Sequence, residues 1–332
     1  MYPKSTFLSC DWGTSAFRLR LVERATLKIL AEESSKEGNA ATAARWQQAG
    51  QPPEQRVGFY LAVIQQQLLK LEATVKTSLD DVPVVISGMA SSTVGMKELP
   101  YKSLPFAVDG SDLLTKTLAQ TPGFKHATLL ISGVKSADDV MRGEETQLVG
   151  CQFENTAEEQ LFLHPGTHAK HVIVQHGQAI SLKTYMTGEF FSLLSTNSIL
   201  AASVEAGGQL EEGKNRAWFE KGVQASQQAN LLHNAFLTRT NDLFKKADKR
   251  ENHFYLSGLL IGSECHDLLL ANLPARITLA GEPVLVALYG AALAGLGIAA
   301  RCPVQTKTAE EVTLNGQAAG LRHHLGATSE KR

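Results

Sequence analysis

The chain has 332 residues, 43% of them hydrophobic, and a formal net charge of −1 from 32 basic and 33 acidic residues. This even balance excludes the basic face of a nucleic-acid or membrane-surface binder, and we expect neither partner. The length predicts two domains, and the longest apolar run, residues 284–300, predicts a buried helix rather than a membrane span. Four scattered cysteines and an N-terminus that resembles a strand rather than a signal peptide predict a cytoplasmic protein with free thiols.

Residues 7–22 predict a strand, a tight polar turn and a second, alternating strand. The turn consists of Asp11, Trp12, Gly13, Thr14 and Ser15. Gly13 lets a ligand approach the main chain, and consecutive N–H groups with the hydroxyls of Thr14 and Ser15 suit phosphate oxygens. Asp11 supplies a carboxylate for a phosphate-bound Mg²⁺. The pattern is equally typical of a β-hairpin with an ordinary polar turn.

Strands and helices alternate over the next hundred residues. We expect a third strand near residues 25–30, a helix over 55–77, buried strands over 82–88 and 127–133, and a short helix over 113–119. The strand that ends at Gly88 is followed by a loop of Met89, Ala90, Ser91 and Ser92, whose hydroxyls suit a polyhydroxy substrate. A plain polar turn is the alternative for this loop.

Residues 161–174 repeat the design of residues 7–22 at an offset of 153 positions. Gly166 falls on Gly13 and Thr167 on Thr14, and residues 178–183 supply a third strand again. The repeat predicts two related domains, each with one phosphate loop, and a nucleotide held between the loops for γ-phosphoryl transfer. Asp11 is matched by His164, so only the first loop carries a metal-facing carboxylate.

Basic side chains follow both turns. Arg18 could bind phosphate or a substrate carboxylate, or be an exposed strand residue. Lys170 could neutralise phosphate charge or be a solvated strand residue, and we expect His168 to donate to phosphate. The histidines at 164, 168, 171 and 176 do not share one strand face, so we expect no zinc site.

The second half continues with a helix from Thr187 and a helical stretch from Asn215 into the 240s. Gly258, Gly262 and Gly281 predict turns at or near strand ends, although close helix packing is the alternative for the first two. Two copies of a three-strand meander with further β/helix alternation predict an α/β fold of two ribonuclease-H-like domains that flank a cleft. We expect the domains to span residues 1–140 and 141–332.

Six blocks of the chain point to a family when they are taken together. They are residues 11–15 with Arg18, residues 88–95 with Tyr101, and residues 140–148, 165–170, 186–190 and 257–264. In this order they resemble the 2-dehydro-3-deoxygalactonokinases, which are members of the actin/sugar-kinase/heat-shock-chaperone superfamily. The resemblance covers most of the chain, from about residue 7 to residue 300.

The resemblance implies ATP-dependent phosphorylation of 2-dehydro-3-deoxy-D-galactonate at its terminal hydroxyl, in galactonate catabolism, with MgATP in the cleft. It implies that the loop from Gly88, together with Tyr101, contacts the sugar acid, and that the Gly turns of the second half pack against adenosine. Arg142 or Arg18 would bind the substrate carboxylate.

Related kinases carry the catalytic base on a Gly-Asp pair ahead of the second phosphate loop, and Gly143-Glu144 occupies that place. Glu144 is therefore the expected base, with Glu145 as the neighbouring candidate. Alternatively, both acids only stabilise a helix start.

The chain departs from the family pattern at four positions. Met96 stands where Trp is common and His171 where an aromatic residue is common, and Ala90 and Ser91 replace Val or Ile and Gly. We expect these positions near the sugar pocket, so a kinase of another 2-keto-3-deoxy acid or aldonate remains an alternative. A nucleotide-binding sensor without turnover is a further alternative, against which the intact Asp11 and Glu144 argue. A homodimer is left open.

Overall fold

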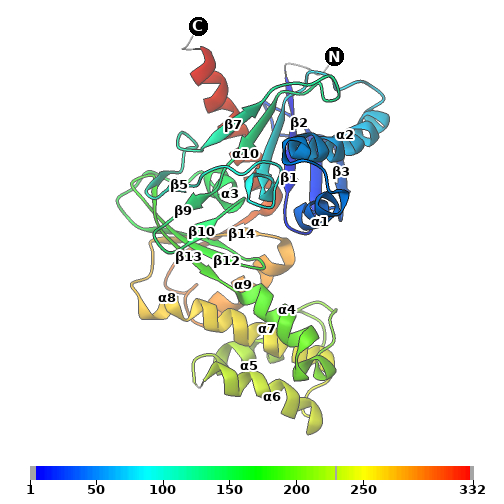
Figure 1. Cartoon of the computed structure of the whole chain (residues 1–332). Coiled ribbons are helices and arrows are strands. Elements are labelled where there is room, and N and C mark those ends of the chain that lie inside the picture. Colours follow the sequence, from blue (N-terminus) through cyan, green and yellow to red (C-terminus); the bar gives the residue numbers. More distant parts are fainter. Residues whose placement is uncertain (1–4, 229, 330–332) are drawn as a thin grey trace. The chain divides into compact units, whose positions relative to one another are not determined.

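The computed structural model describes residues 5–228 and 230–329 (Figure 1). Its contacts divide the chain into two compact units. Of the described residues, those within Met1–Glu154, Gly177–Ser181 and Glu310–Arg332 form the first unit, and those within Asn155–His176 and Leu182–Ala309 form the second. The division expected from the sequence, after residue 140, differs mainly at the C-terminus, because the last helix packs within the first unit.

The first unit combines strands with a few long helices. Its elements are β1 (Thr6–Trp12), β2 (Phe17–Glu23), β3 (Ile29–Ser35), α1 (Asn39–Ala49), η1 (Pro53–Gln55), α2 (Arg56–Val75), β4 (Val84–Gly88), η2 (Met89–Ser91), β5 (Lys102–Ser103), β6 (Phe106–Ala107), β7 (Thr115–Leu118), β8 (Thr128–Ile131), β9 (Val134–Lys135), β10 (Val140–Met141), α3 (Glu144–Gly150) and, from its second residue on, α10 (Ala309–Ser329).

The main sheet of the first unit has the strand order β3-β2-β1-β4-β8-β7. β1, β2 and β3 are antiparallel neighbours, whereas β4 and β8 run parallel to β1. The two faces of β1 alternate because side chains of a strand point to opposite sides. Leu8 and Trp12 pack in one core with α2, and Phe7 packs in another with Leu314 and Leu321 of α10. The three-strand meander and the helix over residues 55–77 are therefore confirmed, but the third strand lies at Ile29–Ser35 and not at residues 25–30, because residues 24–26 turn the chain.

The helix expected over residues 113–119 is wrong. Residues 115–118 form the edge strand β7, which pairs antiparallel with β8 from Thr115 opposite Ile131 to Leu118 opposite Thr128. Thr115 and Thr117 are β-branched and favour an extended backbone, and the open edge of β8 offers the partner that a seven-residue window does not reveal.

The second unit places one sheet beside a group of helices. Its elements are β11 (Gln160–His164), β12 (Ala169–Gln175), the later part of β13 (Gln178–Tyr185), α4 (Thr187–Asn197), η3 (Ile199–Ser203), α5 (Asn215–Ala225), α6 (Leu231–Leu243), α7 (Lys249–Cys265), α8 (Asp267–Leu270), β14 (Arg276–Gly281), α9 (Pro283–Gly295) and β15 (Val304–Thr308).

The sheet of this unit has the strand order β13-β12-β11-β14-β15. This order matches β3-β2-β1-β4-β8 of the other sheet strand for strand. β12 is antiparallel to β11, whereas β14 runs parallel to β11 and β15 runs parallel to β14. β6 pairs with the first residues of β13, which belong to the first unit. The shared order confirms a repeat of two ribonuclease-H-like sheets. The helical stretch predicted from Asn215 into the 240s is split into α5 and α6.

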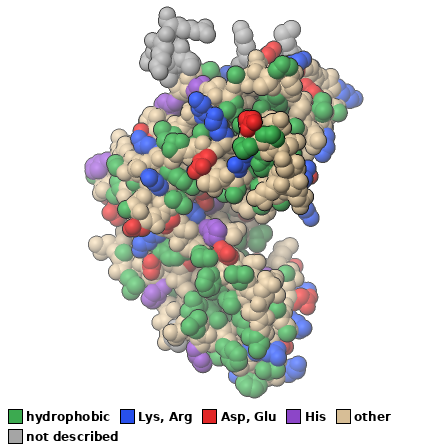
Figure 2. Space-filling model, viewed as in Figure 1, with side chains coloured by type: hydrophobic (Ala, Val, Ile, Leu, Met, Phe, Trp, Pro, Cys, Tyr) green, Lys and Arg blue, Asp and Glu red, His purple; other side chains and the backbone are tan. Residues whose placement is uncertain are grey.

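Hydrophobic side chains gather on the helical part of the second unit (Figure 2). Exposed examples are Met186, Phe190 and Leu193 around α4, and Leu232 and Phe236 of α6. Within residues 5–228 and 230–329, no helix has the length and apolar content that a membrane crossing requires.

Candidate active site

The turn between β1 and β2 is hydrogen-bonded to the start of α1. The N–H groups of Asn39 and Ala40 donate to the carbonyl oxygens of Gly13 (2.9 Å) and Thr14 (3.0 Å). Gly38 precedes α1, and a Cβ atom there would overlap the main chain of Thr14 and Ser15. Thr14 and Ser15 are exposed. The local sequence thus fixes the shape of the turn and leaves its hydroxyls open to a ligand.

Asp11 and Arg18 lie opposite each other on β1 and β2. Nη1 of Arg18 is 3.5 Å from Oδ2 of Asp11, and both side chains are partly exposed. The predicted metal ligand and one predicted carboxylate-binding residue are therefore neighbours.

Three chain segments meet at the ends of β1 and β4. Trp12 and Gly88 are register partners at these ends. Gly88 and Gly143 have φ angles of 95° and 109°, which favour glycine. A Cβ atom on Gly143 would lie only 3.2 Å from the Cα atom of Gly88. This close approach brings Asp11, the loop after Gly88 and the start of α3 to one edge of the first unit's sheet.

Arg142 gathers the predicted sugar-acid residues. Its Nη1 donates to the carbonyl oxygen (2.6 Å) and the hydroxyl (2.5 Å) of Ser91, and its Nη2 donates to the Leu99 carbonyl oxygen (3.3 Å). Its Nε is 3.4 Å from the Tyr101 hydroxyl, and its Cζ lies 4.1 Å from the centre of that ring. The hydroxyl of Ser92 donates to the Met89 carbonyl oxygen (2.7 Å). The hydroxyls of both serines therefore hold the shape of the loop.

The two glutamates at the start of α3 differ in burial. Glu144 is partly exposed, and its Oε2 accepts from the N–H of Arg142 (2.9 Å). Glu145 is fully buried, and its oxygens accept from the N–H of Gly143 (2.6 Å) and the hydroxyl of Thr146 (3.0 Å). Burial, followed by the charge of Glu144, raises the pKa of Glu145 to about 7. Both carboxylates accept from main-chain N–H groups just before α3, and Glu144 is the more accessible of the two.

Gln317 of α10 is a supporting residue that sequence reasoning missed. Its Nε2 donates to the carbonyl oxygen of Cys10 (3.1 Å) and to the hydroxyl of Ser87 (2.8 Å), just before β1 and β4 end. Gly316 allows this, because a Cβ atom there would overlap the Thr146 carbonyl oxygen of α3. No local motif predicts these contacts, since more than 200 positions separate Gln317 from Cys10 and from Ser87 along the chain.

The second predicted phosphate loop connects β11 and β12. Thr167 and His168 are exposed, and Nε2 of His168 lies 2.6 Å from Oε2 of Glu189. Lys170 is opposite His164 in the register, as Arg18 is opposite Asp11, and its Nζ donates to the His168 carbonyl oxygen (2.8 Å). Lys170 is only 4% exposed, so the alternative of a solvated strand residue is wrong.

A cavity of about 200 Å³ adjoins this loop within the second unit. It is largely apolar and receives side chains from α4, α7 and α9. Gly281 ends β14 as predicted, and a Cβ atom there would meet Pro165 at 3.4 Å. The lining residues are Gly166, Thr187, Gly188, Phe191, His253, Ser257, Leu260, Ile261, Val284, Leu285, Leu288 and Tyr289.

Gly258 and Gly262 are not turns at strand ends, and that prediction is wrong. Both lie inside α7, where α5 crosses closely. A Cβ atom at Gly258 would overlap the carbonyl oxygen of Phe219, and one at Gly262 would lie 2.5 Å from the hydroxyl oxygen of Ser226. The alternative of close helix packing is therefore confirmed for both glycines.

Two departures from the family pattern fill cores. Met96 is 1% exposed and belongs to the core of the first unit. His171 is 6% exposed, and its Nε2 lies 2.9 Å from Oε1 of the buried Glu264. Their expected place near a sugar pocket stays a prediction. Ala90 and Ser91 are buried in the loop after Gly88.

Comparisons with known proteins point to one family. The chain is 29% identical over 326 residues to a probable 2-dehydro-3-deoxygalactonokinase of Rhizobium meliloti (strain 1021), which covers 95% of this chain and 96% of the relative. It is 32% identical over 232 residues to a 2-dehydro-3-deoxygalactonokinase of Escherichia coli (strain K12), which covers 68% of this chain and 75% of that protein.

The crystal structure of a candidate 2-dehydro-3-deoxygalactonokinase from Sinorhizobium meliloti superimposes with a TM-score of 0.77 at 28% identity, covering 95% of this chain and 98% of that chain. A model of the family described as 2-keto-3-deoxy-galactonokinase matches residues 11–319. The match spans both sheets and both predicted phosphate loops, and the chain belongs to the 2-keto-3-deoxy-galactonokinase family.

Proposed function

We propose that the chain is a cytoplasmic ATP-dependent kinase that phosphorylates the terminal hydroxyl of 2-dehydro-3-deoxy-D-galactonate in galactonate catabolism. The observation that carries this proposal is the meeting of Asp11, the loop after Gly88 and Glu144 at one sheet edge. A kinase of a sugar hydroxyl needs a metal ligand, a substrate loop and a carboxylate in this combination. The names of both curated relatives support the same reaction.

The sugar acid would bind in the first unit. Arg142 already holds Ser91 and Tyr101 in place, and its planar guanidinium suits a carboxylate. Arg18 is the second cation available to the acid or to a phosphate group. The preorganised loop from Gly88 would then place the terminal hydroxyl near Glu144.

Glu144 would accept the proton of that hydroxyl as its oxygen forms a bond to the γ-phosphorus of ATP. The bond between that phosphorus and the bridging oxygen breaks, and ADP leaves with the electron pair. Glu144 is suited to this role because its carboxylate is partly exposed, whereas Glu145 is enclosed. Exposed Thr14 and Ser15 are the proposed donors to phosphate oxygens in the first unit, and exposed Thr167 is the proposed donor in the second.

The residues present fit a magnesium ion. Mg²⁺ in kinases takes one or two carboxylates together with water and phosphate oxygens, so the single carboxylate of Asp11 is sufficient. The described residues contain no group of three or more His, Cys, Asp and Glu side chains that could form an all-protein metal cage. When bound, the ion would neutralise charge on the phosphate oxygens.

The adenine base would occupy the cavity beside Gly166. An apolar cavity of about 200 Å³ suits a flat aromatic ring, and its contact with the phosphate loop suits a nucleotide. Val284 of α9, which lines the cavity, and Gly281 at the end of β14 replace Gly258 and Gly262 as the neighbours that we propose for the nucleotide.

The alternative substrate, another 2-keto-3-deoxy acid or aldonate, rests on Ala90 and Ser91 in the sugar-acid loop, which stand where Val or Ile and Gly are usual in the family. Rates of ADP release over a panel of sugar acids decide between the two. We expect the highest kcat/KM with 2-dehydro-3-deoxy-D-galactonate and very little ADP release by an Asp11→Asn variant. A higher kcat/KM with an epimer would overturn the substrate, and nucleotide binding without acid-stimulated ADP release would indicate a sensor.

A further inference from the structure

Glu264 of α7 is a buried carboxylate to which the proposed reaction assigns no role. Its side chain is 1% exposed. Its Oε2 accepts from the hydroxyls of Thr187 and Tyr289 (2.6 Å for Tyr289), and its Oε1 lies 2.9 Å from Nε2 of His171. A buried charge is tolerated only when it is paired and hydrogen-bonded, and here α4, α9 and β12 each supply a partner.

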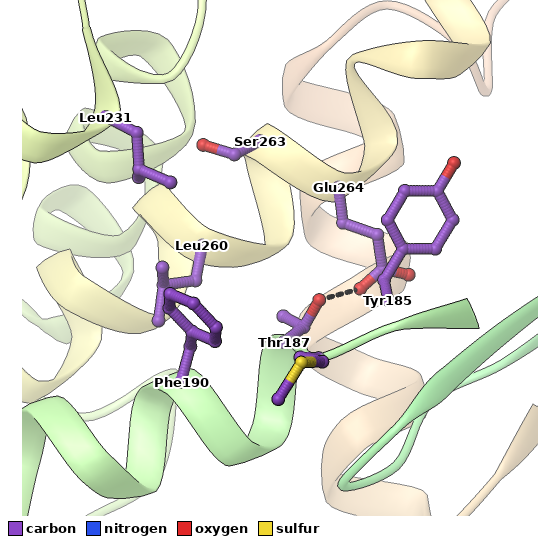
Figure 3. Close-up of a pocket in the computed structure, with 8 residues that line it drawn as sticks. Tyr185, Thr187, Phe190, Leu231, Leu260, Ser263 and Glu264 are labelled. Atoms are coloured by element: carbon purple, nitrogen blue, oxygen red, sulfur yellow. Dashed lines mark hydrogen bonds between the residues drawn. The ribbon is translucent and has the colours of Figure 1, made fainter. Parts of the chain in front are cut away.

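Thr187, one of these partners, is the first residue of α4. Figure 3 shows its hydroxyl joined to Glu264 in the wall of a second cavity, of about 240 Å³. Phe190 of the same helix and Leu260 of α7 lie across this cavity. The hydrogen bond therefore fixes the start of α4 to the buried end of α7.

The two residues after Thr187 contact the second phosphate loop directly. A Cβ atom on Gly188 would lie 2.5 Å from the carbonyl oxygen of Gly166 and 2.8 Å from the Cα atom of Thr167, so only glycine fits. The N–H of Glu189 donates to the carbonyl oxygen of Thr167 (3.0 Å). The first turn of α4 therefore packs directly against the loop and supports its main chain.

We infer that Glu264 is a positioning residue for the nucleotide: through Thr187 it fixes the first turn of α4, and that turn fixes the loop from Gly166. Donors to phosphate are effective only when their geometry is set in advance, and a shift of about 1 Å is sufficient to weaken them strongly. The inference rests on the proposed function, because it requires this loop to bind the phosphates of the nucleotide.

Two substitutions at Thr187 test the inference. Thr187→Val keeps the shape of the side chain and removes its hydroxyl, whereas Thr187→Ser keeps the hydroxyl. We expect Thr187→Val to raise the KM for ATP and the Kd for ADP about tenfold, the size of a lost hydrogen bond to a charged group. The KM for the sugar acid should change by less than about twofold, and Thr187→Ser should restore nucleotide affinity.

Tyr185→Phe is the matched control. It removes a hydroxyl two positions before Thr187 that donates to Asp267 (2.7 Å) and not to Glu264. We expect its nucleotide affinity to equal that of the unaltered protein. Thermal unfolding of every variant, and calorimetric titration with ADP below all transitions, separate positioning from folding.

Unchanged ADP affinity in Thr187→Val overturns the inference, as do equal losses for ADP and sugar acid. If Thr187→Val and Thr187→Ala both fail to fold, Thr187 is a folding contact and the positioning role is also overturned. Failure of the unaltered protein to bind ADP would instead overturn the proposed nucleotide site, and the inference with it.

Discussion

The carboxylate of Asp11 and the guanidinium of Arg18 face each other across β1 and β2, with Oδ2 and Nη1 3.5 Å apart. The acid that we propose as the metal ligand therefore has a cation beside it within the same hairpin. Because both side chains are partly exposed, solvent screens the pair, and each can also engage a ligand.

Asp11→Asn should abolish most turnover while nucleotide still binds. The amide keeps the size of the side chain but removes the charge that organises Mg²⁺. Steady-state ADP release and calorimetric titration with ATP measure the two effects separately. Glu54→Gln, an exposed acid in η1, is the control and should behave like the unaltered protein. Undiminished activity of Asp11→Asn at saturating Mg²⁺ would remove the metal assignment.

Glu144→Gln should lower kcat by roughly 10²–10⁴-fold, as expected for loss of a general base. Binding of both substrates should survive, because the amide can still accept from the N–H of Arg142. Glu145→Gln is the paired variant, since its side chain is enclosed. A normal Glu144→Gln enzyme beside an inactive Glu145→Gln enzyme would place the base one residue later. Normal turnover in both would leave the pair as helix caps.

The pH dependence of stability should carry the signature of Glu145. Its pKa of about 7 in the folded protein lies above the ordinary value of 4.5. The folded state therefore binds the proton more tightly, and the stability from this group is complete below pH 4.5 and is lost as the pH rises through about 7. The free energy of unfolding should fall by roughly 3 kcal/mol in total because of this group.

Urea unfolding of the unaltered protein and of Glu145→Gln across this pH range measures the effect. We expect the free energy of unfolding of the unaltered protein to fall more steeply with rising pH than that of the variant. Parallel pH profiles would show that Glu145 titrates alike in the folded and unfolded chains.

Arg142→Lys should raise the KM for the sugar acid and leave the KM for ATP within about twofold. Lysine cannot reproduce the fork that holds Ser91 and Leu99 while it presents donors to a carboxylate. Arg18→Lys is the comparison, because the responsible arginine should show the larger loss for the acid. Equal losses for ATP and acid would indicate a phosphate role, and no loss at either position would exclude both from the site.

Gly258→Ala should destabilise the second unit by about 1–3 kcal/mol, as overpacking does. The added Cβ would overlap the Phe219 carbonyl oxygen, and backbone atoms of a packed helix cannot rotate away. Gly290→Ala in α9 is the matched control, since no atom of the described residues beyond its chain neighbours and the adjacent turns of its own helix lies within 4 Å of the added Cβ. The control should be neutral or stabilising by about 0.5–1 kcal/mol, because alanine is the better helix former. Similar unfolding midpoints for the two variants would contradict the packing account.

The sequence anticipated the parts of the fold that depend on local pattern. The repeat of a strand, a Gly-Thr turn and a second strand predicted both hairpins, and both sheets have the predicted meander. The helical spacing of the apolar residues Tyr60, Ile64 and Leu68 predicted α2. The errors occurred where an unseen partner decides: the edge of β8 made residues 115–118 a strand, and α5 made Gly258 a packing contact.

The family blocks, the two turns and the acids at the start of α3 could be recognised from the sequence, because each is a contiguous motif with a local cause. Three features follow from the folded chain alone: Glu145 is the enclosed glutamate, Gln317 bonds to β1 and β4, and Glu264 bonds to the start of α4. Burial and long-range hydrogen bonds join residues that are distant in the chain, and no local pattern records the distance between them. The sequence motifs therefore supply the chemical groups of the site, and the packing of the folded core sets their geometry.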